Sequence, residues 1–163
     1  MDTLAHGLWT YAIFYKTKSP KLAVLFGVLP DLISFLPFII LNGGLNHFGK
    51  PHLNDIPTSI IKSYNFTHSL VIAIFAILLI TLVARKFYIF LLAWPIHILI
   101  DIPTHETTFF PTPFLYPISD LRVSGISWAR PEMLAINYLA LIIVYAFIIR
   151  NKIKNGKKST RAN

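Results

Sequence analysis

The 163-residue chain contains no cysteine and has few charged residues. Without cysteine it can form no disulfide and no thiolate metal site, so a metal must be held by histidine, carboxylate or backbone oxygen. Charged residues make up 13% of the chain and hydrophobic residues 55%, and the mean hydropathy is +0.60. One small domain cannot bury so much apolar surface, which excludes a soluble globule, a disordered chain and a fibrous repeat. The composition predicts an integral membrane protein.

Acidic residues are also scarce, with 7 against 15 basic residues and a net charge of +8. Six of the basic residues gather in the last fourteen positions: Arg150, Lys152, Lys154, Lys157, Lys158 and Arg161. A basic cluster beside an apolar helix is typical of an anchor to an anionic leaflet. We therefore expect the lipid bilayer as a partner and do not expect nucleic acid.

The apolar segments predict an all-α fold, a multi-pass transmembrane helical bundle of about four spans plus a short N-terminal helix. The N-terminal segment Leu4–Tyr15 is too short to span a bilayer, and Asp2 or Thr3 is its expected N-cap. Proline predicts that the first long segment is broken or kinked near Pro30. The four long segments are Leu22–Leu41, Phe66–Ala84, Phe87–Ile102 and Pro131–Arg150.

The chain reads as one membrane-embedded helical domain, residues 1–150, followed by a basic, disordered cytoplasmic tail, residues 151–163. Placing Lys16–Lys21, Arg85–Lys86 and the tail inside puts eleven of the fifteen basic residues in the cytoplasm. The loops Asn42–Asn65 and Pro103–Arg130 then lie on the outer side of the cell membrane. In an organism with two membranes, we expect this to be the inner membrane. His47 and His52 fall in the first of these loops, where we expect surface positions.

Two carboxylates, Asp31 and Asp101, interrupt the apolar segments. Each costs about 2.5–3.5 kcal/mol at a bilayer centre on insertion scales. A bound divalent cation can contribute on the order of 10 kcal/mol and would offset both. Protonation or a hydrogen bond inside the bundle is the alternative.

Three histidines favour the cation. In the topology above, His6, His68 and His97 lie near the same outer depth as the two carboxylates. His97 and Asp101 are four residues apart, so a helix places both on one face. His68 is expected in the first turn of its helix, where the dipole keeps the imidazole neutral. Taken singly, each residue is as readily a polar interface residue or a cap, but their coincidence predicts a metal site facing the outer side.

The order His6, Pro30-Asp31, Thr67-His68-Ser69 and His97-x-x-x-Asp101 resembles the prokaryotic membrane-bound metal-dependent hydrolases. The segment TPFLYPIS, residues 112–119, also fits that family's pattern. The family in turn is similar to the all-helical zinc-dependent phospholipase C and single-strand nuclease group.

The resemblance implies Asp31, His68, His97 and Asp101 as ligands of one metal, with Asp101 and His6 serving a second. The group's later HxxxE helix has no counterpart in this sequence, so one or two divalent ions, zinc first, are expected rather than three. His105 and Glu106 follow Pro103 directly. His105 is a candidate extra ligand and Glu106 a candidate catalytic acid or base, although both are equally consistent with solvated loop residues.

The metal-site pattern and the resemblance together predict an integral-membrane metal-dependent hydrolase. The resemblance alone implies that its substrate is a phosphoester, which metal-activated water would attack at the outer face. Asp31 would be a ligand and the proton acceptor, and the substrate would be small or lipid-linked. A metal or proton transporter is a second hypothesis, because buried Asp and His also mark ion pathways. A non-catalytic scaffold with a structural metal site is a third.

Overall fold

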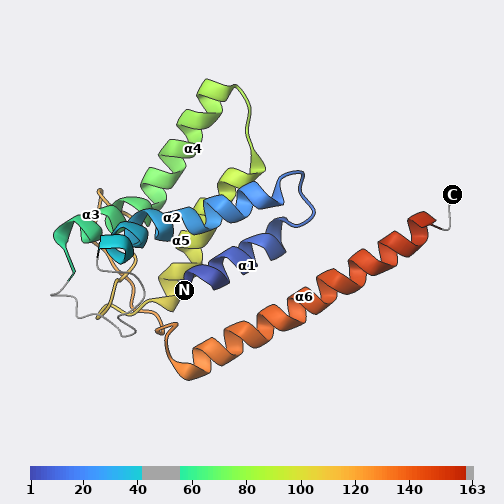
Figure 1. Ribbon diagram of the computed structural model, residues 1–163. Coiled ribbons are helices and arrows are strands. Elements are labelled where there is room, and N and C mark those ends of the chain that lie inside the picture. The colour runs from blue at the N-terminus through green and yellow to red at the C-terminus, as the bar shows by residue number, and fades with distance from the viewer. Residues whose placement is uncertain (42–55, 161–163) are drawn as a thin grey trace.

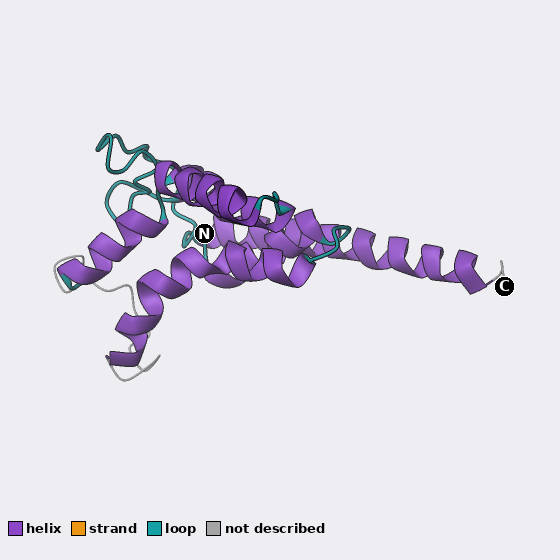
Figure 2. Cartoon of the chain, turned by 90° about the horizontal axis from the view of Figure 1, so that it is seen from above, coloured by secondary structure: helices purple, strands orange, loops and turns teal. Residues whose placement is uncertain are grey.

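The structure, a computed structural model, describes residues 1–41 and 56–160, and in these ranges it is helical with no strand (Figures 1 and 2). The predicted all-α class is therefore confirmed for the described part. Its elements are α1 (Thr3–Phe14), α2 (Pro20–Leu41), α3 (Thr58–Thr67), α4 (Leu70–Ala84), the 3-10 turn η2 (Ile89–Leu92), α5 (Ala93–Thr104) and α6 (Pro131–Thr160).

Two helices are long and apolar enough to cross a membrane, over Pro20–Ile40 in α2 and Pro131–Asn155 in α6. Only 11% of the most apolar stretch of α6 is buried, so its side chains face outward to be covered by lipid. These helices indicate association with a membrane. Helices α3 and α4 make a third span only if the pair, bent by 59°, counts as one. Four spans are not confirmed, because η2 and α5 together form a shorter apolar helix.

Helix α1 begins as the sequence predicts, with the Asp2 side chain accepting a hydrogen bond from Ala5 N at 2.9 Å. It packs closely on α2 at Gly27, where an added Cβ would lie 2.2 Å from Thr10 Oγ1. Any larger residue at Gly27 would push the two helices apart. On its other side α1 meets α6, where Trp9 Nε1 donates to Asn137 Oδ1 at 2.8 Å.

Of the break or kink predicted near Pro30, the break is absent, since α2 runs through both Pro30 and Pro37. Proline removes one helical hydrogen bond, but it leaves the following turns free to continue. Ser34 Oγ donates to the Pro30 carbonyl at 2.8 Å, and the Gly27 carbonyl accepts a hydrogen bond from His97 Nδ1 at 2.7 Å. Side chains thus bond to the carbonyls around the proline.

Helix α6 begins at Pro131, as expected, but it does not end at Arg150. It continues through Thr160, so residues 151–160 are helical rather than disordered. No proline follows Pro131 in the sequence and only one glycine interrupts the last turns, so nothing in the backbone stops the helix.

Helix α3 lies in a stretch expected to be loop. Its start follows Pro57, and Ile60 and Tyr64 share its buried face. The chain breaks after Thr67: His68 caps α3, and the extended Ser69 caps α4 by accepting from Ile72 N at 3.2 Å. His68 is thus not in the first turn of a helix, and the helix dipole that was expected to keep its imidazole neutral does not act there.

The two ends of the molecule differ. In Figures 1 and 2 the N-terminus and the segment between α5 and α6 lie toward one end, and the α1–α2 turn and the C-terminal end of α6 lie toward the other. The buried histidines and carboxylates belong to the first end. His47 and His52 lie outside the described residues.

Candidate metal centre

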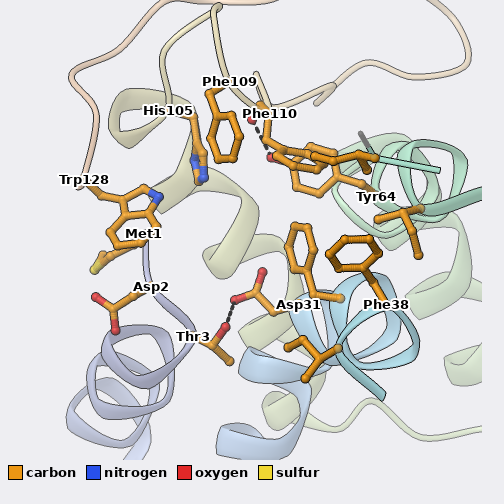
Figure 3. A pocket seen from close by; sticks show the side chains of 14 residues that line it. Met1, Asp2, Thr3, Asp31, Phe38, Tyr64, His105, Phe109, Phe110 and Trp128 are labelled. Atoms are coloured by element: carbon orange, nitrogen blue, oxygen red, sulfur yellow. Dashed lines mark hydrogen bonds between the residues drawn. The ribbon is translucent and has the colours of Figure 1, made fainter. Parts of the chain in front are cut away.

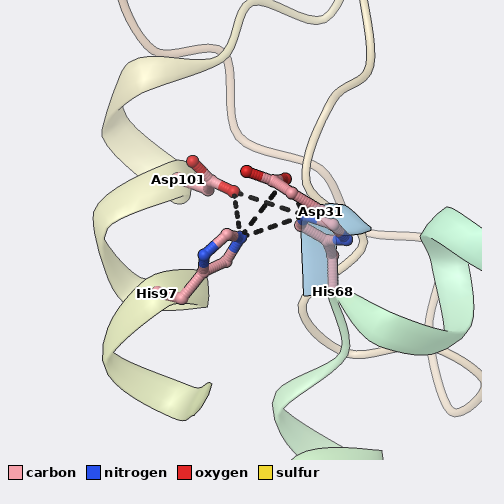
Figure 4. Close-up of side chains that lie close together, drawn as sticks. All are labelled: Asp31, His68, His97 and Asp101. Carbon is pink, nitrogen blue, oxygen red and sulfur yellow. Dashed lines mark hydrogen bonds and ion pairs between the residues drawn. The ribbon is translucent and has the colours of Figure 1, made fainter. Parts of the chain in front are cut away.

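Four buried side chains from three parts of the chain meet at one point (Figure 4). Asp31 comes from the middle of α2, His68 from the break between α3 and α4, and His97 and Asp101 from adjacent turns of α5. One nitrogen or oxygen atom of each lies within 4.8 Å of the others, and this group could hold a metal ion. We call these four residues the Asp/His group.

Five of the six distances among the four atoms are close to those of tetrahedral coordination. Four ligands at about 2.0–2.1 Å from a tetrahedral zinc are separated by about 3.3–3.4 Å. His97 Nε2 lies 3.2 Å from His68 Nε2 and from Asp101 Oδ2, and 3.6 Å from Asp31 Oδ1. His68 Nε2 lies 3.4 Å from Asp31 Oδ1 and 3.5 Å from Asp101 Oδ2. These five edges bracket the tetrahedral value.

The outer nitrogens of both histidines face backbone carbonyls. His97 Nδ1 lies 2.7 Å from the Gly27 carbonyl oxygen, and His68 Nδ1 lies 3.2 Å from the Tyr64 carbonyl oxygen. A carbonyl only accepts, so the neutral tautomer that fits these contacts carries its hydrogen on Nδ1. In that tautomer, the Nε2 lone pair of each histidine points toward the Nε2 of the other histidine and toward the two carboxylates. Asp101 Oδ2 is buried and has no hydrogen-bond partner among the described residues. Four ligand atoms converging in this way could hold a cation between them.

Asp101 also serves a second set of neighbours through its other oxygen. Oδ1 lies 2.9 Å from His6 Nε2 and 3.4 Å from His105 Nδ1, and it accepts from the Met1 amino group. The His6 ring stacks on His97 with 3.7 Å between centroids. His6 and His105 are therefore beside the Asp/His group rather than in it, and Asp101 joins the two sets.

The position of His105 is fixed by backbone hydrogen bonds from a segment later in the chain. Gly125 N donates to the His105 carbonyl at 2.7 Å, and Ile126 N donates to the Pro103 carbonyl at 2.9 Å. Burial, opposed by the Asp101 carboxylate, lowers the pKa of His105 to about 4, so its imidazole is neutral near pH 7.

Glu106, the predicted catalytic acid or base, is not brought to the Asp/His group. Its Oε1 pairs with Arg130 Nη2 at 2.9 Å and accepts from Ser127 N at 3.3 Å. The Ser127 hydrogen bond first, and Arg130 after it, lower the pKa of Glu106, which keeps it ionised. The direction of the chain after Pro103 turns Glu106 away from His105, and the catalytic role expected for it has no support in the geometry.

A cavity of about 330 Å³ adjoins the group, and Asp31 is the member that reaches it (Figure 3). Asp31 Oδ1 faces the two histidines, while its Oδ2 accepts a hydrogen bond from Thr3 Oγ1 at 2.7 Å. His105 and Trp128 also line the cavity. The Asp/His group is thus open to a neighbouring space on the Asp31 side.

Several supporting residues were not found by sequence reasoning. Thr67 Oγ1 lies 2.9 Å from His68 Nδ1 and 2.7 Å from Ser34 Oγ, which links the break before α4 to α2. The Tyr64 ring stacks on His68 at 3.9 Å. The adjacency of Thr67 to His68 was the available signal, but Ser34 and Tyr64 carried none, because their roles depend on how α2 packs against α3.

Comparison with known proteins adds no relative: no family model, no curated protein and no solved structure matches this chain. The class that the structure itself defines is a helical, membrane-associated protein with a buried Asp/His group able to hold a metal ion.

Proposed function

We propose that this protein is a membrane-bound metal-dependent hydrolase that acts on a phosphoester. The observation that carries the proposal is the convergence of four buried ligand atoms beside a cavity, with five of their six separations near the tetrahedral value. The sequence order of these residues, which resembles that of the membrane-bound metal-dependent hydrolases, is independent of that geometry and points the same way.

Zinc is the ion that we propose for the group. Two imidazoles and two carboxylates suit zinc better than calcium or magnesium, which prefer oxygen ligands. Asp31, His68, His97 and Asp101 would hold the first ion, and Asp101 Oδ1, His6 and His105 surround the place for a second. Bound zinc would lower the pKa of a water toward 7 and polarise a phosphoryl oxygen.

The protein's own groups have separate tasks in this proposal. Gly27 and Tyr64 carbonyls fix the two imidazoles in the orientation that turns Nε2 inward. Thr3 holds Asp31 at the edge of the cavity, where that carboxylate can accept a proton from the attacking water. The surrounding burial excludes bulk water and strengthens these interactions.

A structural metal site is the second candidate, because four protein ligands arranged tetrahedrally are also typical of structural zinc. A transporter is less well supported. Among the described residues, the buried histidines and aspartates all belong to the Asp/His group or contact Asp101 directly, as His6 and His105 do. A transport path needs such groups along the membrane depth, not at one end.

We propose further that the site faces the outer side of the cell membrane, with the basic end of α6 in the cytoplasm. The α1–α2 turn carries Lys16, Lys18 and Lys21, and it lies toward the same end of the molecule as the end of α6 (Figure 1). The positive-inside rule places that end in the cytoplasm.

The first test is elemental analysis of protein purified without chelator, followed by assay with bis(4-nitrophenyl) phosphate. We expect one to two equivalents of zinc and hydrolysis that chelator abolishes and zinc restores. Metal without hydrolysis of any phosphodiester would favour the structural site. A protein that neither contains metal nor gains thermal stability from added metal would refute both.

A further inference from the structure

The cavity beside Asp31 is polar on one side and apolar on the other. Figure 3 shows Asp2, Thr3, His105 and Trp128 on one side of Asp31, with Phe38 and Tyr64 on the other. The apolar side is completed by aromatic and aliphatic residues of α2, α3 and the loop after α5: Phe35, Ile39, Ile56, Ile60, Phe109 and Phe110.

The cavity has the size of a ligand site. Its volume of about 330 Å³ lies in the usual range of small-molecule pockets, roughly 300–1,000 Å³. It holds roughly ten groups of the size of a water or methylene, taking about 30 Å³ for each. Water fills apolar cavities poorly, because it finds no hydrogen-bond partners there, so the apolar side favours a hydrocarbon occupant.

Two of the helices that line the apolar side, α2 and α3, also carry exposed apolar side chains. Ile39 in α2 lines the cavity, while its neighbour Ile40 is 68% exposed on the outside of the same helix. In α3, Ile60 lines the cavity and Phe66 is 56% exposed. Hydrocarbon chains are therefore available next to the cavity wherever α2 is embedded in a bilayer.

We propose that this cavity binds the first part of the hydrocarbon chain of a lipid phosphoester, with the phosphate at the Asp31 side beside the Asp/His group. The inference rests on the proposed function, because it names the substrate class of that site. A water-soluble phosphoester would leave the apolar walls uncovered. A lipid phosphoester covers them and keeps its polar end at the only part of the cavity that carries charge among the described residues.

The charges at the polar side make a second requirement. Asp31 and Asp2 would repel a phosphate unless a cation neutralises them, so binding of the phosphate end must depend on the metal. Binding of the hydrocarbon alone must not depend on the metal. An alkyl phosphate and the alcohol of the same chain length therefore behave differently when metal is removed.

The test measures equilibrium binding of radiolabelled ethyl, hexyl and decyl phosphate to the zinc-loaded full chain in nanodiscs, with empty nanodiscs subtracted. We expect affinity to rise at least about tenfold from hexyl to decyl, because each buried methylene adds about 0.8 kcal/mol. Chelator should remove this binding. Decanol that binds as tightly as decyl phosphate, or affinity independent of chain length, would overturn the proposal.

The chain offers a matched pair of variants. Ile39→Trp fills the cavity, and Ile40→Trp makes the same substitution one residue away on the lipid side. We expect Ile39→Trp to weaken decyl phosphate binding at least about tenfold and Ile40→Trp less than about twofold, with ethyl phosphate unaffected by either. Equal effects of both variants would overturn the proposal. If Ile39→Trp does not fold with normal zinc content, Ile39→Phe replaces it in the same comparison.

The outcomes also separate this inference from the proposed function. Zinc-dependent hydrolysis of bis(4-nitrophenyl) phosphate without chain-length dependence would leave the hydrolase intact and refute the hydrocarbon site. Chain-length-dependent binding by a protein with no hydrolytic activity would refute the hydrolase and retain the site for lipid phosphates.

Discussion

Replacing Asp101 with asparagine tests the metal centre at the residue with the most contacts in it. Asp101 is 1% exposed and touches both histidines of the Asp/His group through Oδ2 and both His6 and His105 through Oδ1. Asparagine keeps the shape and one carbonyl oxygen but removes the negative charge. We expect zinc affinity to fall at least tenfold, since loss of mere supporting partners of metal ligands already costs about 10–100-fold.

The loss is measurable as thermal stability. At zinc concentrations 100 times the dissociation constant, binding stabilises the folded state by about 2.7 kcal/mol. A hundredfold weaker site at the same zinc concentration contributes only about 0.4 kcal/mol. The difference corresponds to a decrease in Tm of about 5–9 °C for a chain of this size.

The metal-free proteins provide the control. Without zinc, two effects oppose each other, because a buried amide costs less than a buried carboxylate but the Met1 amino group loses its anionic partner; the metal-free proteins therefore supply the baseline from which the zinc-dependent increase in Tm is measured. Thermal unfolding with and without chelator, together with zinc content, gives all four values. A variant that keeps full zinc content, the zinc-dependent increase in Tm and activity would show that Asp101 is only a hydrogen-bonding residue.

Three further predictions follow from the same geometry. Thr67→Val removes the hydroxyl beside His68 and should weaken zinc binding about 10–100-fold with the fold intact, measured by competition with a chelating dye; unchanged affinity would exclude this support. Glu106→Gln should leave phosphodiester hydrolysis near neutral pH unchanged. Because the pKa of Glu106 is lowered in the folded state, its carboxylate stabilises the fold above its ordinary pKa range, and this stability is lost as the pH falls through the lowered pKa; the variant should therefore have a lower Tm than wild type near neutral pH and the same Tm below that range. Reporter fusions after Lys86 and after Arg150 should both read as cytoplasmic, and an outward reading at either would invert the proposed orientation.

Local signals in the sequence predicted much of this centre. The four-residue spacing of His97 and Asp101 places them on one helix face whatever the rest of the chain does. Asp2 caps α1 because a carboxylate before a helix accepts from its free N–H groups, and Pro131 starts α6 because its missing N–H has no role there. Such features depend only on near neighbours.

The features that the sequence did not predict depend on contacts between distant segments. The apolar run after Phe66 gives no sign that one helix ends before His68 and another starts after Ser69, because the hydrophobic pattern continues across the break. Whether His105 or Glu106 turns inward is decided by residues 125–128, which bond to the backbone of residues 103–105. The cavity is built from residues more than 90 positions apart, and no local period encodes it.

The cost of the Asp/His group is the strongest reason to give it a chemical role. A bundle held together by packing alone is as stable, or more stable, when buried ionic groups are replaced by apolar residues of the same size. This chain has only 7 acidic residues, yet Asp31 and Asp101 are 6% and 1% exposed within two apolar helices. Packing does not require them there, and the carbonyls of Gly27 and Tyr64 hold the facing imidazoles in the orientation that turns Nε2 toward the carboxylates. Binding a cation is the task that these residues fit, and the cavity beside Asp31 gives a ligand access to the group.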